Sequence, residues 1–577
     1  MASNFFKLIL TVVLLLKLVN AINVVVFVPG TSDNDRKALN RIAQHMAFRN
    51  HGACTFKGII IPEKRYLVKQ KLHQVRELSL KLGIPESVYG PVKAAGDRAP
   101  WVPEYDTTLH EIPFWDAHVN ACQPIIDSDL LDKLREDKYD VALVYKGNPC
   151  YLGMVYALNI PFIYYDLDGL TDETVYASGT PPLLGDFPSS QSPYGPTMNF
   201  IEKLWNHWFQ FSEMAAFSGI DWLAGMFSQR YRQQDRLISK QFQEDYELRK
   251  MFPDFPGVNQ IKQEAALYFV NSDPVLEFTG RPLPSNVIFA GGSHIENPKP
   301  LFEPYNVTNA AAKDGVILAS FGYNVNTSTM PERIKTAFID TFKKLPNHQI
   351  YWRVGSEDDP DVMTDRLPEN VNATVFMPQN DLMAAKETRL LITHGGIHSI
   401  MEAVHHGVPL IGIPLTPPQY NNLRKVEAKR FGLILDKNNL TTNNLYKAIK
   451  EVLSNPKYKI AAKAISRAYK DRPMSPFETV IYWLEYVGRN RGAPFLSRKQ
   501  RSNPLAGLLT KEICICFIFV VFIGKLISFF TNFFVLKSNK SLTVISESTT
   551  QSNGHSKFAE YDTSNKQDKK KRVTNPK

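Results

Sequence analysis

The chain has 577 residues, of which 44% are hydrophobic and 21% are charged. This length is too great for a single hydrophobic core, so two or more domains are expected. The net charge of +10 is modest, and no basic stripe is interleaved with aromatic residues, which argues against a nucleic-acid partner. No group of Cys and His residues has the spacing of a zinc site, so no metal is expected.

Residues 1–21 have the features of a signal peptide. Lys7 precedes an apolar run over residues 8–18, and Val19-Asn20-Ala21 is a small-residue cleavage site. The alternative is an uncleaved anchor, although the run is short for a membrane span.

Residues 513–536 form a second apolar segment, long enough to cross a bilayer as one helix. A buried helix of a soluble domain is the alternative. With a cleaved signal peptide, the chain before this segment would be lumenal. Residues 537–577 are rich in Ser, Thr, Asn and Lys, which predicts a disordered cytosolic tail.

The lumenal part would hold three cysteines, Cys54, Cys122 and Cys150, so one disulfide can form, and the sequence leaves the pair open. Glycosylation acceptor motifs fit a lumenal glycoprotein. They begin at Asn306, Asn326, Asn372 and Asn439.

The N-terminal part alternates strands and helices. Residues 22–28 are strongly β-forming and predict a buried parallel strand, followed by a loop and a helix over 37–47. Residues 170–196 are rich in Pro, Gly and Ser and predict a loop. The remaining predicted elements are strands at 58–61, 139–144 and 161–164 and a helix at 150–158.

Residues 200–227 form an aromatic-rich helical region. Its rings favour burial in a core. The alternatives are contact with a membrane interface and a cover over an apolar substrate.

Residues 282–300 are rich in Pro and Gly and predict the boundary between two halves. A second alternation follows. Its strands are predicted at 316–321, 349–354 and 373–376, and its helices at 331–344, 445–454, 458–469 and 475–491. The sequence therefore predicts an α/β protein with two facing Rossmann-like domains, residues 22–290 and 291–510, and ligands at the carboxyl ends of the strands.

One stretch indicates the ligand. A buried strand over 390–392 ends at Thr393-His394-Gly395-Gly396, and a helix is expected over 399–405. A strand, Gly-Gly turn and helix direct backbone N–H groups and the positive end of a helix dipole at one point, which suits a phosphate. Glu402, one turn into the helix, is suited to accept hydrogen bonds from a ribose diol.

This stretch, continued through Gly407-Val408-Pro409 to Gln419, resembles the signature of the UDP-glycosyltransferases, especially the animal UDP-glucuronosyltransferases. The resemblance implies a GT-B fold, with an N-terminal acceptor-binding domain and a C-terminal UDP-sugar-binding domain. It also implies a location in the endoplasmic reticulum lumen, one C-terminal transmembrane helix, and homo- or hetero-oligomers with related transferases.

The resemblance also assigns residues to UDP-sugar, the co-substrate. Phe376 stands where the family usually has a tryptophan stacking on uracil, and Gln379 would contact uracil. Glu402 would bind the ribose and Gln419 the sugar, although Pro418 replaces a usual aspartate beside it. The diphosphate would be held by His394, Gly395, Gly396, Ser399 and His398, the last of which replaces a frequent asparagine.

The catalytic positions differ from the family pattern. The family uses a histidine after the first strand as general base and an aspartate that orients it. Asp35 stands at the histidine position, with Asp33 nearby, and Tyr145 stands at the aspartate position. Asp35 is the expected substitute base, because His45 falls a full helix deeper, where a surface histidine is expected.

The sequence thus predicts a membrane-anchored transferase that moves a hexose, glucuronate or glucose, from UDP to a small lipophilic acceptor with inversion. The alternative is a catalytically weak relative that binds UDP-sugar or a lipophilic ligand, or that modulates a partner. A phosphorylase on the same fold is a more distant option. The acceptor is not readable from the sequence.

Overall fold

The computed structural model describes residues 21–29, 33–59, 72–81, 90, 99–103, 112–180, 187–218, 234–322, 325–355, 366–497 and 518–532. The chain divides into two compact units, residues 1–507 and 508–577. In the second unit, residues 518–532 are helical, and the ends of the predicted span 513–536 lie outside the described residues, as do residues 1–20 and 533–577. No helix within the described residues is both long and apolar enough to cross a membrane.

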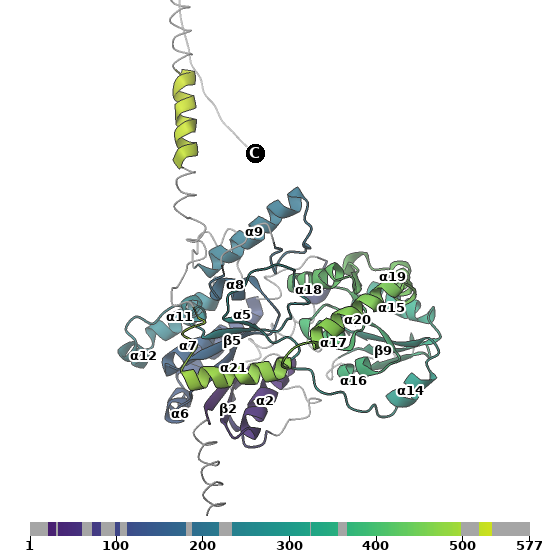
Figure 1. Ribbon diagram of the computed structural model, residues 1–577, viewed down its shortest axis with the longest axis horizontal. Coiled ribbons are helices and arrows are strands. Elements are labelled where there is room, and N and C mark those ends of the chain that lie inside the picture. The colour runs from purple at the N-terminus through teal and green to yellow at the C-terminus, as the bar shows by residue number, and fades with distance from the viewer. Residues whose placement is uncertain are drawn as a thin grey trace, which may run out of the picture. The chain divides into compact units, whose positions relative to one another are not determined.

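The first unit contains two parallel sheets side by side (Figure 1). The N-terminal sheet has seven strands in the order β3-β2-β1-β4-β5-β6-β7. Its central strand β1 reads Asn-Val-Val-Val-Phe-Val and is buried after its first residue, as expected for a parallel strand covered on both faces. The strands are β1 (Asn23–Val28), β2 (Gly52–Ile59), β3 (Arg76–Lys81), β4 (Val141–Tyr145), β5 (Phe162–Asp166), β6 (Leu267–Val270) and β7 (Val287–Phe289).

Helices cover this sheet, and α9 projects from the N-terminal half (Figure 1). They are α2 (Asp33–Phe48), α5 (Ile112–Ile126), α6 (Leu130–Glu136), α7 (Pro149–Leu158), α8 (Asp172–Ala177), α9 (Phe200–Phe217), α11 (Gln234–Glu244), α12 (Tyr246–Met251) and α13 (Val258–Lys262), with a 3₁₀ turn at Ala99–Trp101. A disulfide joins Cys122 of α5 to Cys150 of α7, and Cys54 is a buried free thiol.

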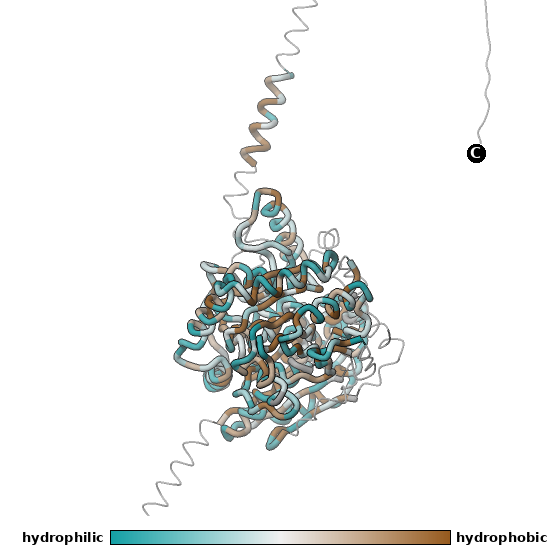
Figure 2. The backbone as a smooth tube through the Cα atoms, turned by 90° about the vertical axis from the view of Figure 1, so that its right-hand side faces the viewer, coloured by the Kyte–Doolittle hydropathy of each residue, from teal (hydrophilic) through white to brown (hydrophobic). Residues whose placement is uncertain are grey.

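The C-terminal sheet has six parallel strands in the order β10-β9-β8-β11-β12-β13. They are β8 (Gly315–Ser320), β9 (His348–Arg353), β10 (Val371–Thr374), β11 (Thr388–Thr393), β12 (Leu410–Gly412) and β13 (Gly432–Ile434). Their apolar side chains form a core on each face of the sheet, and the apolar segments lie mainly inside the folded body (Figure 2).

Within the described residues, the C-terminal half of the first unit has eight α-helices. They are α14 (Tyr305–Ala311), α15 (Glu332–Lys343), α16 (Gln379–Ala384), α17 (Ile397–His406), α18 (Pro417–Ala428), α19 (Thr442–Ser454), α20 (Pro456–Lys470) and α21 (Pro476–Asn490). The last one crosses over to the N-terminal half, where it packs on α2 and β4 (Figure 1).

Several segments differ from the sequence expectation. The strand expected at 58–61 is β2, which begins six residues earlier. In the aromatic-rich region expected to favour a core, Phe200, Trp205 and Trp208 are exposed.

Residues 170–196, expected as a loop, contain α8, whose polar residues are buried among distant partners. For example, Glu173 of α8 lies 3.1 Å from Lys262. The boundary segment 282–300 contains β7, a three-residue strand that exists because it pairs with β6.

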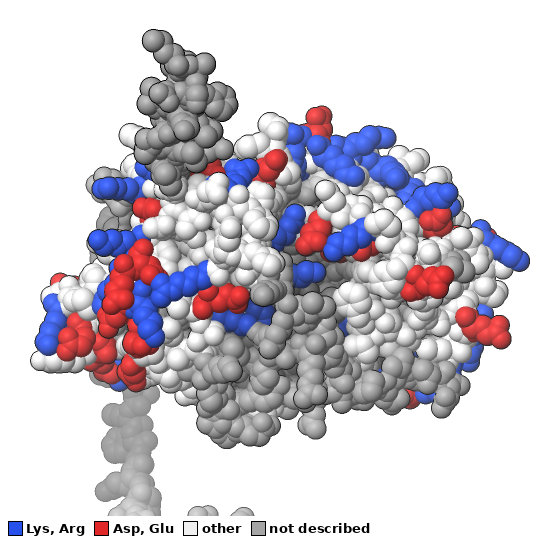
Figure 3. All heavy atoms as spheres, turned by 90° about the horizontal axis from the view of Figure 1, so that it is seen from below, with Lys and Arg blue, Asp and Glu red and all other residues white. Residues whose placement is uncertain are grey.

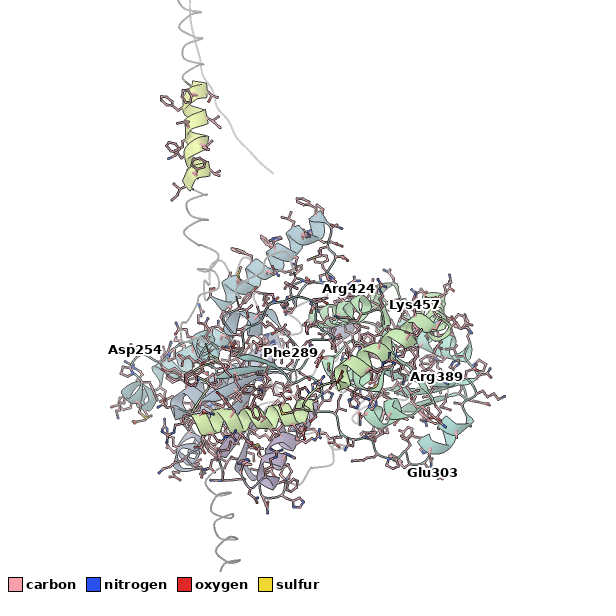
Figure 4. The ribbon with its side chains drawn as sticks, viewed as in Figure 1. Asp254, Phe289, Glu303, Arg389, Arg424 and Lys457 are labelled. Atoms are coloured by element: carbon pink, nitrogen blue, oxygen red, sulfur yellow. A yellow bond between two sulfur atoms is a disulfide. The ribbon has the colours of Figure 1, made fainter. Side chains whose placement is uncertain are left out.

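Polar contacts hold the two halves together. Lys425 of α18 lies 2.7 Å from Glu277, which follows β6, and both side chains are almost fully buried. Arg424, on the same helix, donates to the Pro193 carbonyl, and Figure 4 places Arg424 and Phe289 near the boundary between the halves. Trp101 of the N-terminal half enters a core cluster of the C-terminal half.

The surface carries charges of both signs. In the face shown in Figure 3, basic and acidic side chains are interspersed, and basic ones also gather along one edge.

Replacing Lys425 with Met should lower the free energy of unfolding by about 3–5 kcal/mol, because it leaves the Glu277 carboxylate buried without its cation. Urea titration followed by circular dichroism measures this change. Lys429→Met, on a half-buried lysine one turn further along that donates to the Thr279 hydroxyl, is the matched control and should change stability by less than about 1 kcal/mol. Equal effects of the two variants would contradict the role given to the buried pair.

Candidate functional site

A cavity of about 250 Å³ lies between the two halves. It opens at the carboxyl ends of β8 and β9, which is where parallel α/β sheets bind ligands. Its N-terminal wall is α2, and its C-terminal wall is α17 with the segment before α16. The lining residues are Lys37, Ala38, Arg41, His294, Ile295, Glu296, Lys299, Ser320, Gly322, Arg353, Phe376, Met377, Pro378, Gln379, Asn380, Asp381, His398, Ser399 and Glu402.

The turn after β11 begins one wall of this cavity. Gly395 has a φ of +93°, which disfavours residues with a side chain, and Gly396 is the N-cap of α17. The helix has ten residues and leaves unpaired N–H groups at its start, where Ser399 lies. This end of α17 is suited to bind an anion.

His394 lies beside the cavity rather than in its lining. A Cβ added at Gly396 would approach its Nε2 to 2.7 Å, and one added at Gly322 would approach its Cε1 to 2.9 Å. The imidazole ring is therefore packed closely against two glycines. Burial, with the nearby Arg353, lowers the pKa of His394 to about 4, so the ring is neutral at pH 7.

Glu402 is the centre of a hydrogen-bonded group inside the cavity. The amide nitrogen of Gln379 donates to Glu402 Oε2 over 2.6 Å and to Ser399 Oγ over 3.0 Å. Burial raises the pKa of Glu402 to about 7, although Gln379 and Lys37 oppose the shift. The structure therefore brings together three residues that the sequence placed at one ligand.

Two other predicted ligand contacts have different surroundings. Phe376 is 48% exposed at the cavity lining, so one face of its ring is available for stacking. Gln419 is not in the lining, and its amide oxygen accepts hydrogen bonds from the backbone of Leu415 and Thr416. This is a capping box at the start of α18, so the side-chain oxygen of Gln419 is occupied and only its amide nitrogen is left to contact a sugar.

The residues at the two catalytic positions lie near the carboxyl ends of the neighbouring strands β1 and β4. Asp35, in the first turn of α2, lies with its Oδ1 3.5 Å from Nε2 of His398. Tyr145, the last residue of β4, is buried, and its ring centroid lies 6.1 Å from that of Tyr151. His45 packs against Phe477 and does not line the cavity.

The sequence did not single out several residues of the cavity. His294 follows Gly291-Gly292 just after β7, and its ring centroid is 4.4 Å from that of His398. A Gly-Gly turn after a strand was the signal, but the segment was interpreted only as a linker. The cavity is also lined by four cationic side chains, those of Lys37, Arg41, Lys299 and Arg353.

The cationic side chains favour an anionic ligand. Arg41 donates to the backbone carbonyls of Ser293 and Ile295. Arg353 donates to those of Gly322, Val325 and Val375. Among the described residues, no group of three or more His, Cys, Asp and Glu side chains is placed to hold a metal.

Comparison with known proteins agrees with this architecture. Two solved structures share the fold, at 81% coverage of this chain and 99% of theirs. They are the glycotransferase of kitacinnamycin, with a TM-score of 0.53 and 15% identity, and CalG4, the calicheamicin glycosyltransferase, with a TM-score of 0.52 and 13% identity.

Curated relatives are more similar in sequence. UDP-glucosyltransferase 2 of Dactylopius coccus is 30% identical over 380 residues, covering 65% of this chain and 68% of its own. UDP-glucuronosyltransferase 2C1 of Oryctolagus cuniculus is 29% identical over 380 residues, covering 64% of this chain and 69% of its own. The 2-hydroxyacylsphingosine 1-beta-galactosyltransferase of Mus musculus is 26% identical over 455 residues, covering 78% of each chain.

The profile of the family described as UDP-glucoronosyl and UDP-glucosyl transferase matches residues 105–537, most of the chain. With two parallel Rossmann-like sheets around one cavity, the chain belongs to this family and is a UDP-glycosyltransferase of the GT-B fold.

Proposed function

We propose that this transferase moves glucuronate or glucose from UDP to a small lipophilic acceptor, with inversion at the sugar carbon. The observation that carries the proposal is the group formed by Gln379, Ser399 and Glu402 at the start of α17, inside the cavity between the halves. A carboxylate, an amide and a hydroxyl beside a helix N-terminus match the ribose, base and diphosphate of a nucleotide.

In the proposed complex, Glu402 accepts hydrogen bonds from the ribose hydroxyls. Gln379, released from Glu402, turns to the uracil, and Phe376 stacks on the base. The diphosphate lies at Gly396 and Ser399, where the N–H groups of α17 and the cations of the cavity stabilise its charge. The same groups stabilise the negative charge that develops on UDP as it leaves.

Few of the described side chains are available to contact the sugar of the UDP-sugar. Pro418 offers no side-chain hydrogen-bond partner, and Gln419 has only its amide nitrogen to donate. Lys37 is exposed in the cavity lining and is suited to contact a sugar carboxylate. Curated relatives named as glucosyl, glucuronosyl and galactosyl transferases support a hexose.

A lipophilic acceptor is supported by a relative named for transfer to 2-hydroxyacylsphingosine. The acceptor enters from the N-terminal half, opposite to the UDP, which gives inversion. Apolar side chains on the surface of α9 are consistent with an apolar acceptor or a nearby bilayer. They are Phe200, Ile201, Leu204, Trp205 and Trp208.

For the location we propose the lumen of the endoplasmic reticulum, with residues 513–536 as a membrane anchor. The apolar segments at both ends of the sequence support this, and so does the disulfide between Cys122 and Cys150, because such bonds persist in oxidising compartments. Asn306 and Asn439, which begin glycosylation motifs, are exposed.

The direct test is transfer by the full chain in microsomes. Labelled UDP-glucuronate, UDP-glucose, UDP-galactose and UDP-N-acetylglucosamine are offered with a panel of phenols, amines and sphingoid lipids. We expect transfer from glucuronate or glucose donors to at least one apolar acceptor. UDP binding without transfer from any donor would overturn the proposal and favour a ligand-binding role.

Gly396→Ala should weaken UDP binding, because the added methyl displaces His394 from its place beside the turn. We expect a loss of about tenfold, which is the cost of one lost hydrogen bond to a charged group. Isothermal titration calorimetry measures the affinity. Gly195→Ala is the matched control, because its added Cβ would meet only Arg424 Cδ at 3.8 Å. Unchanged binding by Gly396→Ala would show that the diphosphate lies elsewhere.

The affinity for UDP-glucose should rise with pH through about 7 and then level off. Burial raises the pKa of Glu402 to about 7, and binding needs the ionised carboxylate, so the empty protein must first release a proton. At pH 6 about one tenth of the molecules are ionised, which predicts about tenfold weaker binding than at pH 8.

UDP-glucose is the suitable probe for this titration because, unlike UDP, it has no phosphate that titrates near neutral pH. Glu402→Gln, of nearly the same shape, should bind more weakly and lose the pH dependence. If the affinity of Glu402→Gln changed with pH as much as that of the wild type, another group would be responsible for the titration.

A further inference from the structure

Two side chains from opposite halves meet at the cavity. Asp35 comes from the first turn of α2 and His398 from the first turn of α17, and Oδ1 of Asp35 lies 3.5 Å from Nε2 of His398. That nitrogen is buried and makes no hydrogen bond within the described residues. The pair is therefore a carboxylate and an imidazole within ion-pair range, at the wall of the substrate cavity.

The end of α17 that carries His398 is also the end at which the proposed diphosphate binds. The sugar carbon is bonded to that diphosphate, so it must lie within a few ångströms of the first turn of α17. A group on this turn that faces α2 is thus beside the sugar carbon, on the side from which the N-terminal half presents the acceptor. His398 occupies this place and lines the cavity.

His294 packs against His398, with ring centroids 4.4 Å apart. Burial and the neighbouring His398 hold the pKa of His294 well below its usual range, so His294 stays neutral. Its Nε2 lies 4.0 Å from Oε1 of Glu402. The other titratable or charged groups around the cavity are Lys37, Arg41, Glu296, Lys299, Arg353, Asp381 and Glu402.

We infer that His398 is the general base of the transfer and that Asp35 is the positioning residue that orients it. This inference rests on the proposed function. Asp35 accepts the N–H at Nε2, which leaves the lone pair of His398 on Nδ1. The acceptor hydroxyl gives its proton to Nδ1, and the acceptor oxygen forms a bond to the sugar carbon. The bond from the sugar carbon to UDP breaks at the same time, and its electron pair goes to the β-phosphate oxygen. The proton then leaves His398 for solvent.

This division of roles is chemically better than Asp35 acting alone. A carboxylate with a reference pKa near 4 is a weak base, whereas imidazole titrates close to pH 7. A carboxylate that accepts one N–H of an imidazole fixes its tautomer and stabilises the imidazolium that forms. The 3.5 Å separation is longer than a usual hydrogen bond, and catalytic contacts of this kind commonly shorten when substrate binds.

The test compares His398→Asn and Asp35→Asn in the full chain, with a donor and acceptor that the wild type uses. At saturating UDP-sugar, His398→Asn should lower kcat about 10²–10⁴-fold, while calorimetry shows UDP affinity within about threefold of wild type. In the wild type, kcat should fall toward acidic pH, and we call this fall the acid limb. In His398→Asn the acid limb should be absent. Because the donor is saturating, the ionisation of Glu402, which affects donor binding, does not contribute to the pH dependence of kcat.

Asp35→Asn should lower kcat while UDP affinity stays within about threefold of wild type, because the imidazole loses the carboxylate that fixes its tautomer. Asp35→Glu, which keeps the charge, should restore part of kcat. A purely structural role of Asp35 would lower kcat and UDP affinity together. His45→Asn, on the same helix as Asp35 but outside the cavity, is the control and should leave kcat unchanged.

Three results would overturn the inference. One is a kcat of His398→Asn close to wild type. Another is a loss of UDP affinity in that variant with kcat intact, which would make His398 a diphosphate contact only. The third is removal of the acid limb by His294→Asn rather than by His398→Asn. A wild type that transfers no sugar from any donor would instead overturn the proposed function, and the inference with it.

Discussion

The fixed position of one Rossmann-like half against the other is the constraint on which the site depends. The buried ion pair of Lys425 and Glu277 crosses this boundary, and Trp101 inserts from one half into the core of the other. The helix α21 returns from the C-terminal half to pack on α2 and β4. Because parallel strands direct their carboxyl ends toward the boundary, loops from both sheets meet there. A ligand in the cavity therefore contacts both halves at once.

Burial at this boundary gives the site its electrostatic character. It raises the pKa of Glu402 to about 7 and lowers that of His394 to about 4. At pH 7 His394 is therefore neutral and Glu402 is about half protonated, which reduces the cost of holding them out of water. The cations that line the cavity supply the positive field that a UDP-sugar requires. These features favour an anionic ligand.

The sequence predicts the regular part of this structure well and the irregular part poorly. Apolar runs such as Val24 to Val28 can be interpreted locally, because a buried parallel strand needs only its own side chains to be recognised. The helix α8 has no such pattern, since its Glu173 is buried by Lys262 from a distant segment. His294 lies in a linker by composition, and only the fold brings it to His398. Gln419 shows the converse: the resemblance assigns it to the sugar, whereas in the structure its amide oxygen caps the start of α18 together with Thr416, three residues earlier.

We propose that UDP binds between the halves with its ribose on Glu402 and its diphosphate at the start of α17. An experimental structure of the full chain with UDP bound would test this most directly. We expect Gln379 to have released Glu402, both ribose hydroxyls to contact this carboxylate, and the β-phosphate to contact Ser399 and the backbone of α17. A nucleotide bound elsewhere, or an intact hydrogen bond between Gln379 and Glu402 in the complex, would contradict the claim.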